Sequence, residues 1–141
     1  MSDSAEHLKL AGEWQNISHN NLELLLQKLG ASFIIRKVGP RVSPSQRISF
    51  EGGKMFITTE TGISTKESTV LIDGTEFSDE MFQKPFVATA TINDTGSIRV
   101  QGKLGGIDLT VLREINDEGQ MVLTTNVEDV ECVRIFGRKQ L

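Results

Sequence analysis

From residue 46 to the C-terminus, short runs of apolar and β-branched residues alternate with turn-forming residues at intervals of roughly 8–12 positions. The clearest turns are Gly52-Gly53, Asp73-Gly74, Gly105-Gly106 and the segments 93–96 and 116–119. Between the turns, the pattern predicts strands at 46–51, 54–61, 64–72, 75–78, 85–93, 97–104, 107–115, 121–127 and 130–138. A further strand is expected at 13–18, which gives about ten in all.

These connections are short, and short connections join antiparallel neighbours. A sheet of so many strands would expose two unpaired edges if it stayed open, and closure into a barrel removes them. The sequence therefore predicts an all-β protein, a ten-stranded antiparallel up-and-down barrel. At 141 residues it is expected to form one domain, 1–141.

Residues 20–38 have a different pattern, typical of two short helices. Leu22, Leu25, Leu26 and Leu29 fall on one helical face, and Gly30 can end that helix. Asn20 and Asn21 are favourable residues for its N-terminal cap. A second helix is expected over 32–38, since Pro40 and Pro44 bar its continuation. Residues 1–10 predict an irregular lead-in.

Composition excludes several classes of function. The formal net charge of −4 argues against nucleic acid as a partner, because binding phosphates needs a dense basic surface. Cys132 is the only cysteine, so neither an intramolecular disulfide nor a thiolate metal cage can form. His7 and His19 lack ligand spacing, and we expect no metal and no cofactor. No nucleophile elbow or acid–base pair argues for an enzyme.

The N-terminus shows no signal peptide, and no segment has the roughly 18 apolar residues of a membrane span. We therefore expect a soluble protein in the cytoplasm, and one that acts as a monomer. Two glycosylation sequons, at Asn16 and Asn93, are chance matches in such a compartment.

Two arginines interrupt the alternation of apolar and polar residues in the last strands. Arg113 shares a face with Leu109 and Val111, and Arg134 shares one with Cys132 and Phe136. An inward arginine keeps its charge and is costly to bury without an acceptor. A ligand carboxylate would match its planar fork, directly or through water.

The pattern alone leaves an alternative open. The strand 130–138 can also be drawn with Val133 and Ile135 inward, which puts Arg134 outside. Arginine is found at the surface more often than in the interior, so the alternation by itself favours that second interpretation.

Several motifs, in order along the chain, resemble those of the intracellular lipid-binding protein family, specifically the fatty-acid-binding proteins. The resemblance extends from about residue 10 to residue 139 and rests on Gly12-Glu13-Trp14, Asn21-Leu22-Glu23, Gly30, Arg36-Lys37-Val38, Pro44, the segment 48–53, Val111-Leu112-Arg113-Glu114 and Arg134-Ile135-Phe136. Leu22 departs from the family pattern, which has an aromatic residue there.

The resemblance implies a ten-stranded barrel with a helix–turn–helix lid, about residues 20–38, between the first two strands. It also implies one interior lipid site, in which the arginines matching Arg113 and Arg134 bind a fatty-acid carboxylate. Many relatives have tyrosine where this chain has Phe136, so one hydroxyl donor is missing here. Two retained arginines favour an acidic ligand over an alcohol such as retinol.

Further cavity residues are predicted on the same basis. Leu22 and Leu26 are expected on the inner face of the lid, and Phe33 in the second helix is a weaker candidate for contact with the lipid tail. Ile63 falls where relatives often carry a phenylalanine near the lipid entrance, and Ala90 belongs to a strand face whose small residues leave volume. The leucines can instead serve to pack the helix onto the mouth of the barrel, and this structural role is compatible with contact to the lipid.

The function predicted from this resemblance is a non-enzymatic carrier of a long-chain fatty acid or related acidic lipid between membranes and proteins. One alternative is a lipid-responsive module whose lid contacts a membrane or a partner protein through Lys28, Arg36 and Lys37, although these can equally form a solvated face. Others are a carrier of a retinoid-type acid and an enzyme acting on a lipid inside the barrel.

Overall fold

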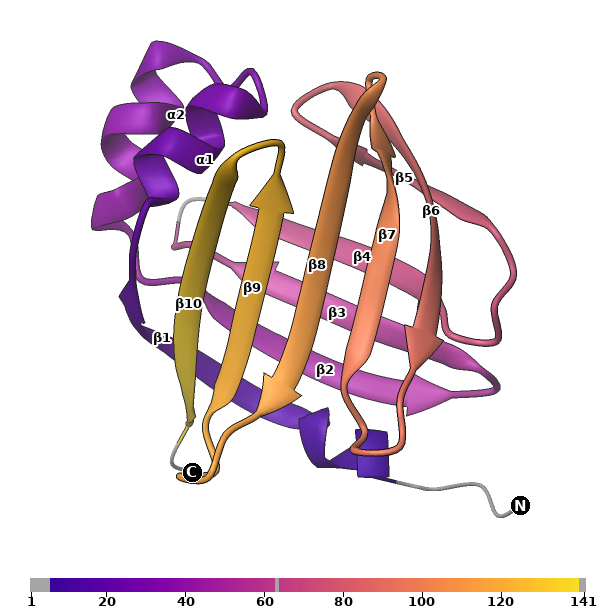
Figure 1. Ribbon diagram of the computed structural model, residues 1–141. Coiled ribbons are helices and arrows are strands. Elements are labelled where there is room, and N and C mark those ends of the chain that lie inside the picture. The colour runs from indigo at the N-terminus through magenta and orange to yellow at the C-terminus, as the bar shows by residue number, and fades with distance from the viewer. Residues whose placement is uncertain (1–5, 63, 140–141) are drawn as a thin grey trace.

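A computed structural model describes residues 6–62 and 64–139 of the chain, and Figure 1 shows its arrangement. In these residues ten antiparallel strands form one sheet that curls into a nearly closed barrel, which confirms the predicted fold class. The strands are β1 (Gly12–His19), β2 (Ser45–Glu51), β3 (Lys54–Glu60), β4 (Thr65–Leu71), β5 (Phe77–Met81), β6 (Lys84–Ile92), β7 (Ile98–Leu104), β8 (Ile107–Ile115), β9 (Met121–Val127) and β10 (Val130–Arg138).

Each strand pairs with its neighbour in sequence, and β1 also pairs with β10. The order is β4-β3-β2-β1-β10-β9-β8-β7-β6-β5, so β4 and β5 are the two edges. Backbone hydrogen bonds do not join these edges in the described residues. The side chains of Lys66 and Asp79 bridge them, with Nζ and Oδ1 3.0 Å apart.

Two short helices lie between β1 and β2 and cover one end of the barrel (Figure 1). They are α1 (Leu22–Lys28) and α2 (Phe33–Val38), and a 3₁₀ turn, η2 (Gly39–Arg41), follows. Gly30 has a φ of 82°, a conformation that suits glycine just after a helix end. Ser32 caps α2, because its hydroxyl accepts a hydrogen bond from the backbone N–H of Ile35.

Of the two asparagines predicted as helix caps, Asn21 occupies the N-cap position of α1, but neither side chain caps the helix. Asn21 precedes α1 in a left-handed conformation, and its side chain makes no capping hydrogen bond. Its Nδ2 instead donates to the carbonyl of Glu131 at 2.9 Å, and Oδ1 of Asn20 accepts from the N–H of Val133 at 2.8 Å. Both asparagines therefore fasten the start of the lid to β10.

Two other predictions needed correction. Residues 6–10 of the predicted irregular lead-in form η1 (Glu6–Leu10), a 3₁₀ helix that ends in the fully buried Leu10. The fifth strand begins at Phe77 rather than at residue 75. Oδ1 of Asp73 accepts from the N–H of Thr75 at 2.9 Å, and this side-chain turn prolongs the connection before the strand can start.

The core at the base of the barrel is closed by large side chains. Trp14 and Phe136 are fully buried, and the indole N–H of Trp14 donates to the carbonyl of Leu10 at 2.9 Å. Satisfying that donor makes burial of the tryptophan favourable. Among the described residues, no helix is long and apolar enough to cross a membrane.

Candidate functional site

Arg113 lies on the inward face of β8. Its side chain is only 7% exposed, and Nη2 donates to Oε1 of Gln46 on β2 at 3.3 Å. Its Nε is buried and has no hydrogen-bond partner. The alternation along β8 explains this position. Leu109, Val111 and Arg113 are two residues apart and share one face of the strand, on which Leu109 is fully buried.

Arg134 lies on the inward face of β10, between the fully buried Cys132 and Phe136. Its guanidinium carbon is 5.9 Å from the centre of the Phe136 ring. Nε is again buried and unpartnered. The alternative in which Val133 and Ile135 fill the interior is therefore excluded for this strand.

Both guanidinium groups are uncompensated. No acidic side chain lies within salt-bridge distance of Arg113 or Arg134 in the described part of the chain. Burial, reinforced by the positive charge of Arg134, lowers the pKa of Arg113 to about 10. Burial also lowers the pKa of Arg134. The two groups stay charged at neutral pH, and a bound anion would relieve the cost of burying them.

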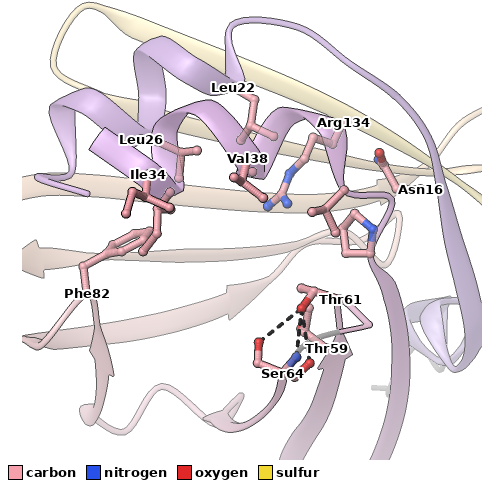
Figure 2. Close-up of a pocket in the computed structure, with 14 residues that line it drawn as sticks. Asn16, Leu22, Leu26, Ile34, Val38, Thr59, Thr61, Ser64, Phe82 and Arg134 are labelled. Atoms are coloured by element: carbon pink, nitrogen blue, oxygen red, sulfur yellow. Dashed lines mark hydrogen bonds between the residues drawn. The ribbon is translucent and has the colours of Figure 1, made fainter. Parts of the chain in front are cut away.

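Two neighbouring cavities, which share Arg134 and several other lining residues, lie beside these arginines. The inner cavity, of about 370 Å³, is bounded by strands and by α1, and both arginines line it. The lid cavity, of about 430 Å³, lies beneath α1 and α2 and is also lined by Arg134. Figure 2 shows the guanidinium of Arg134 pointing into the lid cavity, below Leu22 and Val38. Arg134 therefore stands where the two spaces meet.

An unusual turn contributes to the opening of both cavities. Phe82 and Gln83 join β5 to β6, with φ of 51° and 64°. Two-residue hairpins favour such dihedrals, although a bulky residue there is uncommon. Phe82 lines both cavities, and its ring faces Ile34 of α2 in Figure 2. The turn thus holds an aromatic ring opposite the lid.

The remaining predicted cavity residues lie in different places. Leu22 and Leu26 line both cavities. Phe136 and Ala90 are buried in the core but do not line either cavity. Phe33 is 64% exposed, lies beside Arg36 and Lys37 on the outside of α2 and lines neither cavity. Ile63 lies outside the described residues.

Sequence reasoning overlooked the polar residues of the inner cavity other than the arginines, among them Gln46, Thr59 and Thr125. Gln46 accepts from Arg113, and its Nε2 donates to Oγ1 of Thr59 at 3.2 Å. The alternation that singled out the arginines would also have found Gln46, since it shares a face of β2 with the buried Ile48. By contrast, no sequence signal marked Phe82.

The site offers an anion-binding group and an apolar space rather than reactive chemistry. Burial raises the pKa of the Cys132 thiol, which makes it a poor nucleophile. Within the described residues, no group of three His, Cys, Asp or Glu side chains could hold a metal ion.

Comparisons with known proteins agree with this geometry. No protein-family model matches the chain. It is 30% identical to sodium/calcium exchanger regulatory protein 1 of Doryteuthis pealeii, covering 92% of this chain and 96% of that one. It is 33% identical to human fatty acid-binding protein 9, covering 90% and 95%. A solved structure of the REP1-NXSQ fatty acid transporter matches with a TM-score of 0.85 and 29% identity, over 94% and 97% of the two chains.

The two sequence relatives and the fold, a barrel with a helical lid, indicate the same family. Identity of 30% or more extends over nearly the full length of this chain and of its relatives. The match to the solved structure likewise covers 94% of this chain. The chain therefore belongs to the intracellular lipid-binding protein family, the family of the fatty-acid-binding proteins.

Proposed function

We propose that this protein binds a long-chain fatty acid or a related acidic lipid inside the barrel and carries it between membranes and proteins without altering it. The observation that supports this best is the pair of inward-facing arginines, the buried Arg113 and the partly buried Arg134, which line one cavity and have no acidic partner in the described chain. A carboxylate is the anion that a guanidinium fork pairs with most directly.

The tail and the head group contribute differently. Burying each methylene contributes about 0.8 kcal/mol, so the hydrocarbon supplies much of the affinity. The arginines orient the carboxylate and discriminate against uncharged lipids. Phe136 provides no hydroxyl, so the proposal includes a head group held partly through ordered water.

The test is a matched pair of ligands. Palmitate and hexadecanol would be titrated into the wild type and into Arg113→Gln combined with Arg134→Gln. We expect the double variant to lose palmitate binding far more than hexadecanol binding, because only palmitate carries a charge. Arg47→Gln combined with Arg99→Gln is the control, since both of these arginines are exposed. Equal losses for the two ligands would rule out the carboxylate role.

A retinoid-type acid remains the second choice of ligand within the same proposal. It carries the same carboxylate but a more rigid tail. Competition between retinoic acid and palmitate for the ligand-free protein, monitored by displacement of a fluorescent fatty acid, separates the two. The lower dissociation constant identifies the preferred class.

The lid suggests a second role, transient docking on membranes. α2 buries none of its side chains, and Phe33, Ile34 and Ile35 are all exposed beside Arg36 and Lys37. Exposed apolar residues flanked by cations suit an anionic membrane surface. If the lid docks, transfer of palmitate to vesicles will accelerate with their anionic lipid content and slow with salt. Transfer that ignores both variables would contradict docking.

The proposal also includes a monomer in the cytoplasm that needs no cofactor. Cys132 is buried and free, which fits a reducing compartment. Light scattering of the purified protein, with and without palmitate, tests the monomer. Incubation with lipids followed by mass spectrometry tests for an enzymatic product, and any turnover would contradict the carrier role.

A further inference from the structure

The inner cavity has a second polar region that the two arginines do not explain. It consists of Lys66 and Ser68 on β4 and Asp79 on β5, and all three line the cavity. Alternation sets them inward, because Ser68 shares a face with the buried Val70 and Asp79 shares one with the buried Phe77. We call these three residues the gap cluster.

The sheet order separates the gap cluster from Arg134. β10 stands fifth among the ten strands, whereas β4 and β5 are the two ends. When such a sheet curls into a nearly closed barrel, its middle strand comes to lie across the interior from its two edges (Figure 1). The cavity therefore has a polar group on each of two opposing walls.

The gap cluster has unused capacity for hydrogen bonds. Lys66 Nζ is 3.0 Å from Oδ1 of Asp79, and that same oxygen accepts from the N–H of Glu80 at 2.7 Å. Within the described chain, the second carboxylate oxygen and the hydroxyl of Ser68 have no hydrogen-bond partner. An ammonium has three protons to donate, and Lys66 uses one. The cluster can thus both donate to a ligand and accept from it.

Apolar residues line the cavity between these two polar walls. Ile57, Val70, Phe86 and Val100 are all buried there. A plain hydrocarbon end that reaches the gap cluster removes water from an ion pair and replaces none of its hydrogen bonds, which is unfavourable. A hydroxyl group, which is donor and acceptor at once, replaces both.

We propose that the gap cluster is a second binding subsite, which takes a hydroxyl group on the chain of the bound lipid, and that the ligands of this protein include hydroxylated fatty acids. This inference rests on the proposed function, since the carboxylate is assigned to Arg113 and Arg134. The ammonium group of Lys66 donates a hydrogen bond to the hydroxyl oxygen of the lipid, and the carboxylate of Asp79 accepts a hydrogen bond from that hydroxyl.

The test is the ratio of two dissociation constants, for ω-hydroxypalmitate and for palmitate. It is measured on the wild type and on Lys66→Met combined with Asp79→Leu, which removes both charges together. In the wild type we expect a ratio near one. In the double variant, the loss of hydrogen bonds to charged groups should weaken ω-hydroxypalmitate about tenfold relative to palmitate.

The matched control is Lys103→Met combined with Asp108→Leu. This pair consists of the same residue types, 2.8 Å apart, on the outer surface of β7 and β8. A ratio that does not change in the gap variant, or that changes equally in the control, overturns the subsite and leaves Lys66–Asp79 as a tether between edges. Failure of the wild type to bind palmitate would instead contradict the proposed function.

Discussion

The β8 wall of the cavity and its lid side each present one arginine, in unlike surroundings. On the β8 wall, Arg113 is almost completely buried and is held by Gln46 from across the barrel. On the lid side, Arg134 is partly exposed, stacks near Phe136 and faces a space whose roof consists of two short helices. The same side chain is thus fixed in one place and less constrained in the other.

The difference separates two contributions to ligand binding. A group that is already positioned loses little conformational freedom when the ligand arrives, but its charge is costly while the site is empty. A less constrained group costs less in the empty protein and must be ordered on binding. We therefore expect Arg113 to contribute more to affinity and to subtract more from the stability of the ligand-free protein.

Replacing Arg113 by methionine should have the largest effect. We expect palmitate to bind about 100-fold more weakly, since removing one partner of a buried charge pair costs about 2–5 kcal/mol. We also expect the ligand-free protein to gain about 1–3 kcal/mol in unfolding free energy, because an uncompensated buried charge is removed. Titration calorimetry and urea unfolding measure the two. Arg99→Met, on the exposed face of β7, is the control.

The pH dependence of that gain follows from the pKa of Arg113. Its folded-state pKa, about 10, lies below the usual value for an arginine. Between the folded-state pKa and the usual one, the unfolded chain binds more protons, so the wild type becomes more stable relative to Arg113→Met as the pH rises. Below pH about 10 the gain of the variant should stay constant. Both proteins would be unfolded with urea in parallel at each pH. A stability advantage of the variant that grew above pH about 10 would contradict this prediction.

Gln46→Glu should have the second largest effect, because it places a carboxylate where an amide now accepts from Arg113. The new carboxylate would pair with Arg113 and compete with the ligand. We expect palmitate affinity to fall about 30-fold, since a hydrogen bond to a charged group contributes about 1.5–3 kcal/mol. Gln46→Met keeps the size without the charge and should change affinity much less. Equal affinities for the two variants would refute the competition.

The strands were predictable because their physical signals are local. Turn residues and period-two alternation determined most strand ends to within one or two residues, as at β8 and β10. β5 was displaced because the side chain of Asp73 extended its turn, a contact that no periodicity reveals. That β4 and β5 remain unpaired depends on the closing geometry of the whole sheet.

The residues that line the cavity were less predictable than the strands, because long-range packing decides which side chains border the cavity. Alternation found that Arg113 and Arg134 share faces with apolar residues, but only the folded chain shows which residues border empty space. Ala90 fits the strand alternation but is buried in the core away from the cavities, whereas Phe82, which lies in a turn, lines the lid cavity. Phe33 lies outside because other apolar residues of α2, Ile34 and Val38, face the space under the lid together with the leucines of α1.

Arg134→Met should have a smaller effect than Arg113→Met. Because Arg134 is partly exposed, water screens its charge more than that of Arg113, and its attraction to a carboxylate is weaker. We expect palmitate affinity to fall about tenfold and the unfolding free energy to change by less than in Arg113→Met. The same calorimetry and urea titrations compare the two variants. A loss larger than that of Arg113→Met would reverse the assignment of the fixed and the less constrained arginine.

The smallest effect on stability is expected on the lid itself, from Phe33→Ser. Phe33 is 64% exposed and lines neither cavity, so the unfolding free energy should change by no more than about 0.5 kcal/mol. Leu25→Ala is the contrast, because Leu25 is buried in α1 and its truncation should cost about 2–3 kcal/mol. Phe33→Ser should nevertheless slow palmitate transfer to anionic vesicles if α2 docks on them. Stability that falls as far as in Leu25→Ala would show instead that α2 is as firmly packed as α1, and that the lid side is not the looser of the two regions.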